Sequence, residues 1–147
     1  MSPIFHLSIP VHHLQEAVDF YTSQLSAQIG RHTATYADAL LFGAQVTLQN
    51  DPSGVPQPMP RARHFGATLA WSEWESAAER LSTAPFLVEE PTISFAGQST
   101  EQAKLMIADP SGNLIEIKAY RHPEAVLGPL AASVQGQLTT DGPATGG

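Results

Sequence analysis

The chain of 147 residues contains no cysteine. Disulfides, thiolate metal sites and cysteine nucleophiles are therefore excluded, and any bound metal must be held by nitrogen and oxygen atoms. Basic residues are also few, since seven Lys and Arg stand against fourteen Asp and Glu and give a formal charge of −7. Because such a chain on average repels a phosphate backbone, we expect no nucleic-acid partner.

Long apolar runs are missing as well. No segment approaches the roughly 20 consecutive apolar residues that cross a bilayer, and the opening MSPIFHLSIPVHH has no basic leader. The motifs GxGxxG, GxxxxGK and GxSxG do not occur, so nothing supports dinucleotide, P-loop or serine-hydrolase chemistry. We predict a cytoplasmic protein that has no membrane partner and acts on a small molecule.

Proline divides the chain. Residues 51–60 (DPSGVPQPMP) carry four prolines and cannot form a helix or a central strand. This stretch predicts a linker between two units at about 3–50 and 62–120, within a single domain over 1–122. The remaining residues, 123–147, are rich in Ala, Gly, Pro, Ser and Thr and predict a flexible tail.

Each unit opens in the same way. Alternating apolar residues predict a strand over about 5–11 and again over 65–71, and helical spacing predicts a helix after each, over about 14–25 and 74–81. The pattern βαβββ is thus repeated, which predicts an α+β fold whose two repeats form an open, cup-shaped mixed sheet with helices outside. The later strands are expected at Tyr36–Phe42, Gln45–Gln49, Phe86–Val88, Lys104–Ala108 and Asn113–Ala119.

Three local motifs refine this prediction. Ser72 and Glu75 have the spacing of a capping box at the start of the second helix. Gly43 and Ala44 separate two strand-like runs tightly enough for a hairpin. The segment 109–113 (DPSGN) has the composition of a tight turn before the last strand.

Strand alternation also defines a polar face. Opposite the apolar residues lie His6 and Gln49 in the first unit, and His64 and Glu116 in the second. Imidazole nitrogen and carboxylate oxygen suit Fe(II), Mn, Ni or Zn, and two His with one carboxylate leave positions open for a bidentate substrate and for dioxygen or water. If these faces line one concave surface, they form a metal site.

Three segments resemble a known family. FHLSIPVHHLQEAVDFY, RHFGATLAW with the SEWESAAERL that follows it, and DPSGNLIEIKAY are similar to the vicinal oxygen chelate superfamily. That superfamily includes glyoxalase I, extradiol dioxygenases, epimerases, fosfomycin-modifying enzymes and bleomycin-binding proteins. The resemblance covers about Ile4 to Tyr120 and is closest to small extradiol-dioxygenase-like members. It implies an Fe(II) site held by His6, His64 and Glu116.

Three functions remain open on this basis. The first is an extradiol-type ring-cleaving dioxygenase, the second a glyoxalase-type lyase or isomerase, and the third a non-catalytic antibiotic- or small-molecule-binding protein. Glyoxalase I has a further acidic ligand where this chain has Thr47 or Gln49, which disfavours the second function. Gln49 can still be a fourth ligand or a substrate contact, and Tyr36 and His32 are candidates for handling protons.

The remaining expectations concern the edges of the site. Superposing the apolar stripes of the two helices places Gly66, rather than His64, opposite His6, although both lie on the same strand face. Glu101 and Gln102 lie in a polar loop that could cover the pocket. Because extensive sheet faces in so short a chain need cover, we expect a homodimer.

Overall fold

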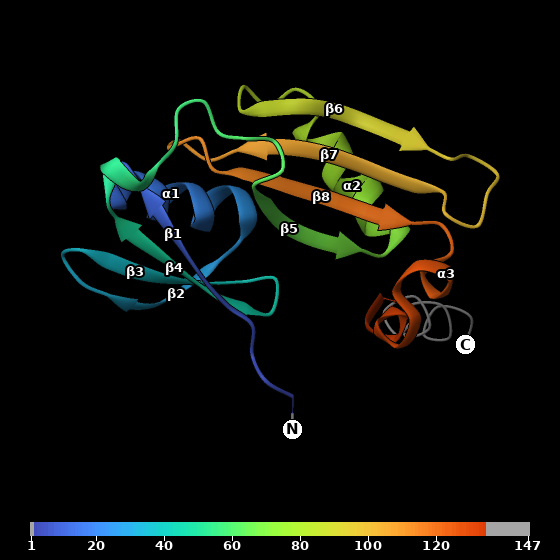
Figure 1. Cartoon of the computed structure of the whole chain (residues 1–147), viewed down its shortest axis with the longest axis horizontal. Coiled ribbons are helices and arrows are strands. Elements are labelled where there is room, and N and C mark those ends of the chain that lie inside the picture. Colours follow the sequence, from blue (N-terminus) through green and yellow to red (C-terminus); the bar gives the residue numbers. More distant parts are fainter. Residues whose placement is uncertain (1, 135–147) are drawn as a thin grey trace. The chain divides into compact units, whose positions relative to one another are not determined.

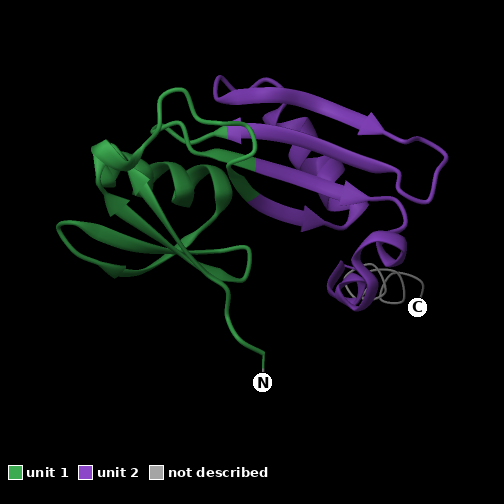
Figure 2. Cartoon of the chain, viewed as in Figure 1, with its two compact units in different colours: residues 1–65, 108–115 green, residues 66–107, 116–147 purple. Residues whose placement is uncertain are grey.

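The computed structural model describes residues 2–134, which form two compact units (Figures 1 and 2). The first unit combines the chain up to residue 65 with residues 108–115, and the second combines 66–107 with the chain from 116 onward. No helix among the described residues is long and apolar enough to span a membrane. The elements are β1 (His6–Val11), α1 (Leu14–Leu25), β2 (Gln28–His32), β3 (Tyr36–Leu41), β4 (Ala44–Asn50), η1 (Pro52–Gly54), β5 (His64–Leu69), α2 (Trp71–Leu81), β6 (Leu87–Ser94), β7 (Gln102–Ala108), β8 (Leu114–Tyr120), α3 (Pro123–Leu127) and η2 (Gly128–Ala131).

The strands form two four-stranded sheets, in the orders β1-β4-β3-β2 and β5-β8-β7-β6. In the first sheet β1 runs parallel to β4, whereas β3 is antiparallel to both β4 and β2. Each sheet follows one βαβββ repeat of the sequence, with α1 and α2 as the long helices (Figure 1). The predicted α+β class and the duplicated βαβββ pattern are therefore confirmed.

The first helix packs its apolar face on the first sheet. Leu14, Ala17, Val18 and Tyr21 are buried at helical spacing, as the sequence predicted. Burial of such side chains contributes roughly 1.5 to 3 kcal/mol each for the larger ones. The second helix is anchored differently, because the buried Trp74 indole Nε1 donates a hydrogen bond of 3.0 Å to a backbone carbonyl of β8.

Two predicted turns are present. The β3–β4 hairpin turns through Phe42 and Gly43, which have φ values of 54° and 72° and so give the left-handed pair that a two-residue hairpin requires. The second turn is the DPSGN segment, where the Gly112 N–H donates to Asp109 O at 2.9 Å and Gly112 has a φ of 94°. A side chain at either glycine would strain the backbone.

The predicted capping box at Ser72 does not form. The helix α2 begins earlier, with Ala70 as its N-cap and no side-chain cap hydrogen bond. The Trp74 N–H donates to Ala70 O at 3.0 Å, which places Ser72 inside the first turn. The indole hydrogen bond of Trp74 and its burial explain this earlier start, since they orient the first turn onto the sheet.

The C-terminal segment also differs from the expectation of a flexible tail over 123–147. Its first part forms α3 and η2, and Val134 is buried. A proline near the start of each element supplies the backbone angle that a first helical turn needs. The rest of the predicted tail, 135–147, lies outside the described residues.

Candidate functional site

The face of the first sheet opposite α1 carries rows of polar side chains. In the strand register His6 pairs with Gln45, Ser8 pairs with Thr47, and Thr47 also pairs with Asp38 on β3. Residues paired in register lie side by side on the same face. The polar face predicted on β1 and β4 is therefore present, and it extends onto β3, which the sequence did not indicate.

At the centre of this face is an ion pair whose carboxylate is buried. Arg31 of β2 holds Asp38 of β3 in a fork, with Nε–Oδ2 at 2.5 Å and Nη2–Oδ1 at 3.3 Å. The Thr47 hydroxyl donates a further hydrogen bond of 2.7 Å to Oδ1. The Asp38 side chain is 3% exposed, whereas the Arg31 side chain is 60% exposed. The hydrogen bond from Arg31 lowers the pKa of Asp38 to about 2, against the opposing effect of burial.

This ion pair predicts a specific acid sensitivity. Because the pKa of Asp38 in the folded chain lies below its ordinary value of 3.8, the ionised carboxylate stabilises the fold above that pH. The stabilisation is lost as the pH falls towards about 2. We expect the free energy of unfolding to decrease more between about pH 5 and pH 2 in the wild type than in Asp38→Asn. Urea titrations at each pH measure this difference, and equal slopes in the two proteins would contradict it.

A hollow of about 300 Å³ opens on this polar face. Among residues 2–134, Arg31 is the only Arg, Lys, Asp or Glu that lines it. Tyr36 lies beside Arg31, with the guanidinium carbon 5.0 Å from the ring centroid. The predicted contact residue Gln49 lines the same hollow, as does His6. The full lining consists of His6, Ser8, Arg31, Tyr36, Thr47 and Gln49.

The two predicted histidine ligands have the same local arrangement. His6 is the first residue of β1, with its Nδ1 atom 3.1 Å from the carbonyl oxygen of Gln45. His64 is the first residue of β5, with Nδ1 2.8 Å from the carbonyl oxygen of Arg61. In metal sites, a histidine that binds the ion through one ring nitrogen commonly has the other ring nitrogen on a backbone carbonyl, which orients the ring.

His6 and His64 each open the first strand of their repeat. The helix that follows begins one residue sooner after the strand start in the second repeat, since the N-caps are His13 and Ala70. The helix starts and the strand starts therefore give different alignments, and the residue of β5 that is equivalent to His6 stays a prediction.

The predicted carboxylate ligand, Glu116, lies on β8 with its side chain 15% exposed. Its Oε1 atom is 3.4 Å from the Lys118 ammonium, so the two side chains form an ion pair. Gly66 of β5 lies against the Glu116 backbone so closely that a Cβ at Gly66 would be 1.7 Å from the Glu116 carbonyl oxygen. Glycine at this position therefore permits the backbone approach beside Glu116.

The three predicted ligands are not gathered in one cluster. Among residues 2–134, no three His, Asp or Glu side chains are grouped so that they could hold one metal ion. His6 lines the polar hollow, whereas His64 lines a second hollow. The convergence of His6, His64 and Glu116 on one metal ion thus stays a prediction.

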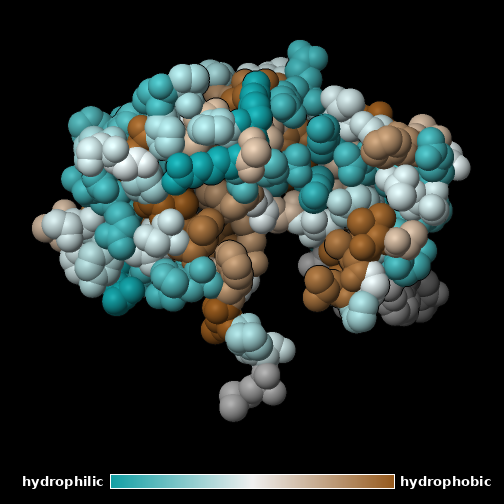
Figure 3. Space-filling view, in the orientation of Figure 1, coloured by the Kyte–Doolittle hydropathy of each residue, from teal (hydrophilic) through white to brown (hydrophobic). Residues whose placement is uncertain are grey.

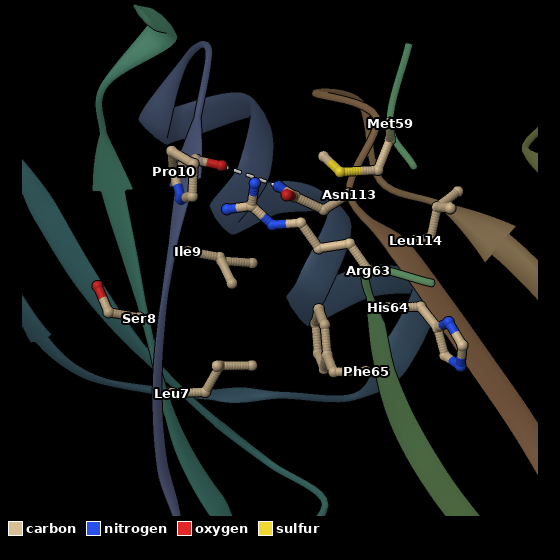
Figure 4. Close-up of a pocket in the computed structure, with 10 residues that line it drawn as sticks. All are labelled: Leu7, Ser8, Ile9, Pro10, Met59, Arg63, His64, Phe65, Asn113 and Leu114. Carbon is tan, nitrogen blue, oxygen red and sulfur yellow. Dashed lines mark hydrogen bonds between the residues drawn. The ribbon is translucent and has the colours of Figure 1, made fainter. Parts of the chain in front are cut away.

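The second hollow, of about 150 Å³, is mainly apolar (Figure 4). Side chains of Leu7, Ile9 and Phe65 form much of its wall, and Figure 4 shows the His64 ring turned away from Leu7 and Ile9. Arg63 is also part of its lining. A hollow of this composition suits the apolar part of a small ligand.

Other predicted residues have local structural contacts. Glu101 accepts a hydrogen bond of 3.0 Å from the Gly97 N–H and forms a 3.5 Å ion pair with Arg121, which holds its own loop. Gln102 opens β7 and pairs with β6, and His32 is exposed at the end of β2. None of Glu101, Gln102 or His32 lines either hollow described above.

A scan against protein-family models places these observations in a family. The model described as the Glyoxalase/Bleomycin resistance protein/Dioxygenase superfamily matches residues 4–117. The chain belongs to this superfamily. Its members include glyoxalases, fosfomycin resistance proteins and dioxygenases, so membership establishes the vicinal oxygen chelate fold without selecting one activity.

Solved structures agree with this superfamily. A glyoxalase/bleomycin resistance protein/dioxygenase from Alicyclobacillus acidocaldarius is 25% identical and superposes with a TM-score of 0.76, covering 85% of this chain and 96% of that chain. A fosfomycin resistance protein from Listeria monocytogenes is 15% identical, with a TM-score of 0.68 and coverage of 86% and 99%. A lactoylglutathione lyase from Agrobacterium tumefaciens is 16% identical, with a TM-score of 0.63 and coverage of 87% and 98%. A search of curated proteins found no match.

Superfamily members generally bind divalent metals. The chemistry of the residues in this chain fits such an ion. His6 and His64 supply imidazole nitrogens and Glu116 supplies a carboxylate, which together form a nitrogen and oxygen donor set for Fe(II), Mn, Ni or Zn. Among the described residues of a single chain, however, these three donors are not grouped around one point.

Proposed function

We propose that this protein is a metal-dependent enzyme whose substrate is chelated through two vicinal oxygens, and that its reaction is extradiol-type ring cleavage. The observation that carries the proposal is the matched pair of histidines. Each opens the first strand of its repeat, and each has Nδ1 facing a backbone carbonyl, at 3.1 and 2.8 Å. A backbone carbonyl on one ring nitrogen is also the contact that orients histidines in metal sites.

In this proposal His6, His64 and Glu116 hold the ion, with Fe(II) favoured. When bound, such an ion acts as a Lewis acid and as a template for the two substrate oxygens. Gln49, at the wall of the polar hollow, is proposed as a substrate contact, and the Tyr36 hydroxyl as a group that can hold a substrate proton. A glyoxalase-type isomerase would use the same chelation with a different substrate.

We further propose that two copies of the chain form a homodimer. Both opening strands, β1 and β5, lie at the edge of their sheets, and an edge strand readily pairs with or packs on another chain. The first unit also exposes the large apolar side chains of Ile4 and Phe5, and Figure 3 shows hydrophobic surface beside the N-terminal segment. A second copy would cover this surface and can complete the ligand set.

The test is metal content. We expect protein purified without chelator, then loaded anaerobically with Fe(II), to hold about one equivalent per chain, and His6→Ala, His64→Ala and Glu116→Ala each to hold less than about a tenth. The matched control is His122→Ala, which removes an exposed histidine at the N-cap of α3. Oxygen uptake with catechol supports dioxygenase chemistry, and turnover of the methylglyoxal–glutathione adduct supports the isomerase. Wild-type protein that binds none of Fe(II), Mn(II), Ni(II) or Zn(II) would refute both the dioxygenase and the isomerase reaction.

Hybrid dimers then show which chains supply the ligands. In a His6→Ala:Glu116→Ala hybrid, sites built from two chains leave one site with all its ligands, so half of the wild-type metal content is expected. Sites built within one chain leave each site lacking a ligand, and the hybrid would bind none.

A second candidate function is favoured by the apolar hollow at Leu7, Ile9 and Phe65. It is a non-catalytic protein that binds an antibiotic or another small molecule with an apolar body. The same variants separate the two candidates. A binding protein would retain ligand affinity in His6→Ala and Glu116→Ala, whereas the enzyme would lose metal and turnover together.

A further inference from the structure

The polar hollow of the first unit is electrostatically one-sided. Its lining is polar, and among the described residues it includes no Asp or Glu, with Arg31 as the one permanently charged side chain. The chain as a whole has a formal charge of −7, so an exposed guanidinium in a hollow without acidic lining does not follow from composition. Because the charge of Arg31 is paired with that of Asp38, such a hollow binds an anionic ligand through the exposed N–H donors of the guanidinium and not through a net positive charge.

The geometry of Arg31 leaves part of the guanidinium available to a ligand. Its Nε and Nη2 atoms are turned towards Asp38, and Nη1 is 3.5 Å from the Tyr36 hydroxyl, at the limit of a hydrogen bond. A guanidinium has five N–H donors, so this arrangement does not use all of them. The side chain is 60% exposed, which leaves the remaining edge of the fork accessible.

The carboxylate of Asp38 lies beneath the surface of the hollow. Its side chain is 3% exposed, and it also accepts a hydrogen bond of 2.7 Å from Thr47. The negative charge is therefore held by hydrogen bonds from Thr47 and Arg31, while the guanidinium itself is exposed. Asp38 thus fixes the direction of Arg31 without presenting its own charge to a ligand.

We propose that Arg31 binds a carboxylate on the substrate, so that the substrate class is a vicinal-oxygen compound that also carries a carboxylate. Asp38 is the positioning residue that holds Arg31 in place. The inference rests on the proposed function in one respect: His6 lines the same hollow, so the chelated oxygens and the carboxylate would belong to one molecule. Arginine suits this task because its planar fork matches a carboxylate.

A matched pair of probes tests the assignment. Catechol and 3,4-dihydroxybenzoate have the same vicinal hydroxyls and differ by one carboxylate. We expect calorimetry on Zn(II)-loaded wild-type protein to show about tenfold tighter binding of 3,4-dihydroxybenzoate, as a charge-assisted contact implies. Arg31→Gln should abolish this preference while catechol affinity and metal content stay unchanged, and Arg31→Lys should keep part of it. Equal affinities in the wild type would overturn the inference.

Asp38→Asn tests the positioning role. We expect it to reduce the preference for 3,4-dihydroxybenzoate and to leave catechol affinity unchanged, because a neutral amide holds the Arg31 fork less firmly than the carboxylate does. A preference equal to that of the wild type would refute this role.

Binding experiments on the metal-free protein distinguish the inference about Arg31 from the proposed metal-dependent function. Here benzoate and benzyl alcohol are the probes, since they differ in the carboxylate and need no ion. Benzoate binding that is lost in Arg31→Gln supports the inference even if no metal binds and the proposed function fails. Benzoate binding that survives Arg31→Gln, or its absence from the wild type, overturns the inference even if the metal site is real.

Discussion

Gly66→Ala is expected to destabilise the protein by about 3 kcal/mol or more, because the new methyl group has no space. An ideal Cβ at this position lies 1.7 Å from the carbonyl oxygen of Glu116, 2.7 Å from its carbonyl carbon and 2.9 Å from its nitrogen. All three are backbone atoms of the adjacent strand β8, so no side-chain rotation relieves the clash. Only separation of β5 from β8 can do so, at the cost of ladder hydrogen bonds.

Urea unfolding followed by circular dichroism measures this loss of stability. The control is Gly30→Ala in β2, where the nearest atom to a new Cβ is Asp38 Cβ at an ordinary 3.6 Å. We expect Gly30→Ala to change the free energy of unfolding by less than about 1 kcal/mol. If Gly66→Ala proves as stable as Gly30→Ala, the close approach of β5 to β8 at Glu116 is incorrect.

The elements that sequence analysis missed are those without a periodic apolar signal. Strand β2 has the sequence QIGRH, in which Ile29 is the only large apolar residue, so no alternation distinguishes it from a loop. Strand β6 was predicted only at its start, Phe86–Val88, because its remainder contains Pro91 and lies beyond shifts in register. Both strands lie at sheet edges, where proline and charge are tolerated.

Strand alternation alone predicted one part of the candidate site, the polar faces of β1 and β4. These faces followed from period two, and His6 and Gln49 of these faces line the polar hollow. The Arg31–Asp38 pair was missed because its residues meet through the unpredicted strand β2. One signal in the sequence could have indicated the pair. Asp38 lies between two alanines in an apolar run, and a carboxylate buried there requires a partner such as Arg.

The convergence of His6, His64 and Glu116 is a different kind of prediction. Alternation assigns each residue to a strand face, but it contains no information on which faces meet. The resemblance to the superfamily supplied that step, and the described residues of one chain do not gather the three side chains. Metal content and the hybrid dimers are therefore the measurements on which the enzymatic proposal depends.

Asp109→Ala is expected to destabilise the first unit by about 3 to 5 kcal/mol, because it removes the acceptor at the centre of a buried network. Oδ1 accepts the N–H groups of Ser111 and Asn113, each at 2.9 Å. Oδ2 accepts the Tyr21 hydroxyl at 2.8 Å and Asn113 Nδ2 at 3.0 Å. Burial and then the charge of Asp109 raise the pKa of Tyr21 well above its ordinary value, so its hydroxyl stays protonated and donates.

The same network joins the DPSGN turn to the start of the chain. Asn113 Nδ2 also donates to the Pro10 carbonyl at 2.9 Å, and the Ser111 hydroxyl accepts the His12 N–H at 2.8 Å. Loss of the Asp109 carboxylate leaves buried donors unsatisfied and loosens this connection to β1, so the cost exceeds that of one hydrogen bond.

Thermal and urea unfolding measure the effect, with Asp51→Ala as the matched control. The Asp51 carboxylate accepts one exposed hydrogen bond from Ser53, so its loss should cost less than about 1 kcal/mol. Tyr21→Phe removes one donor and its share of the network, and should cost about 1 to 2 kcal/mol. If Asp109→Ala costs no more than Asp51→Ala, the DPSGN turn does not stabilise the first unit, and its place in the superfamily motif needs another explanation.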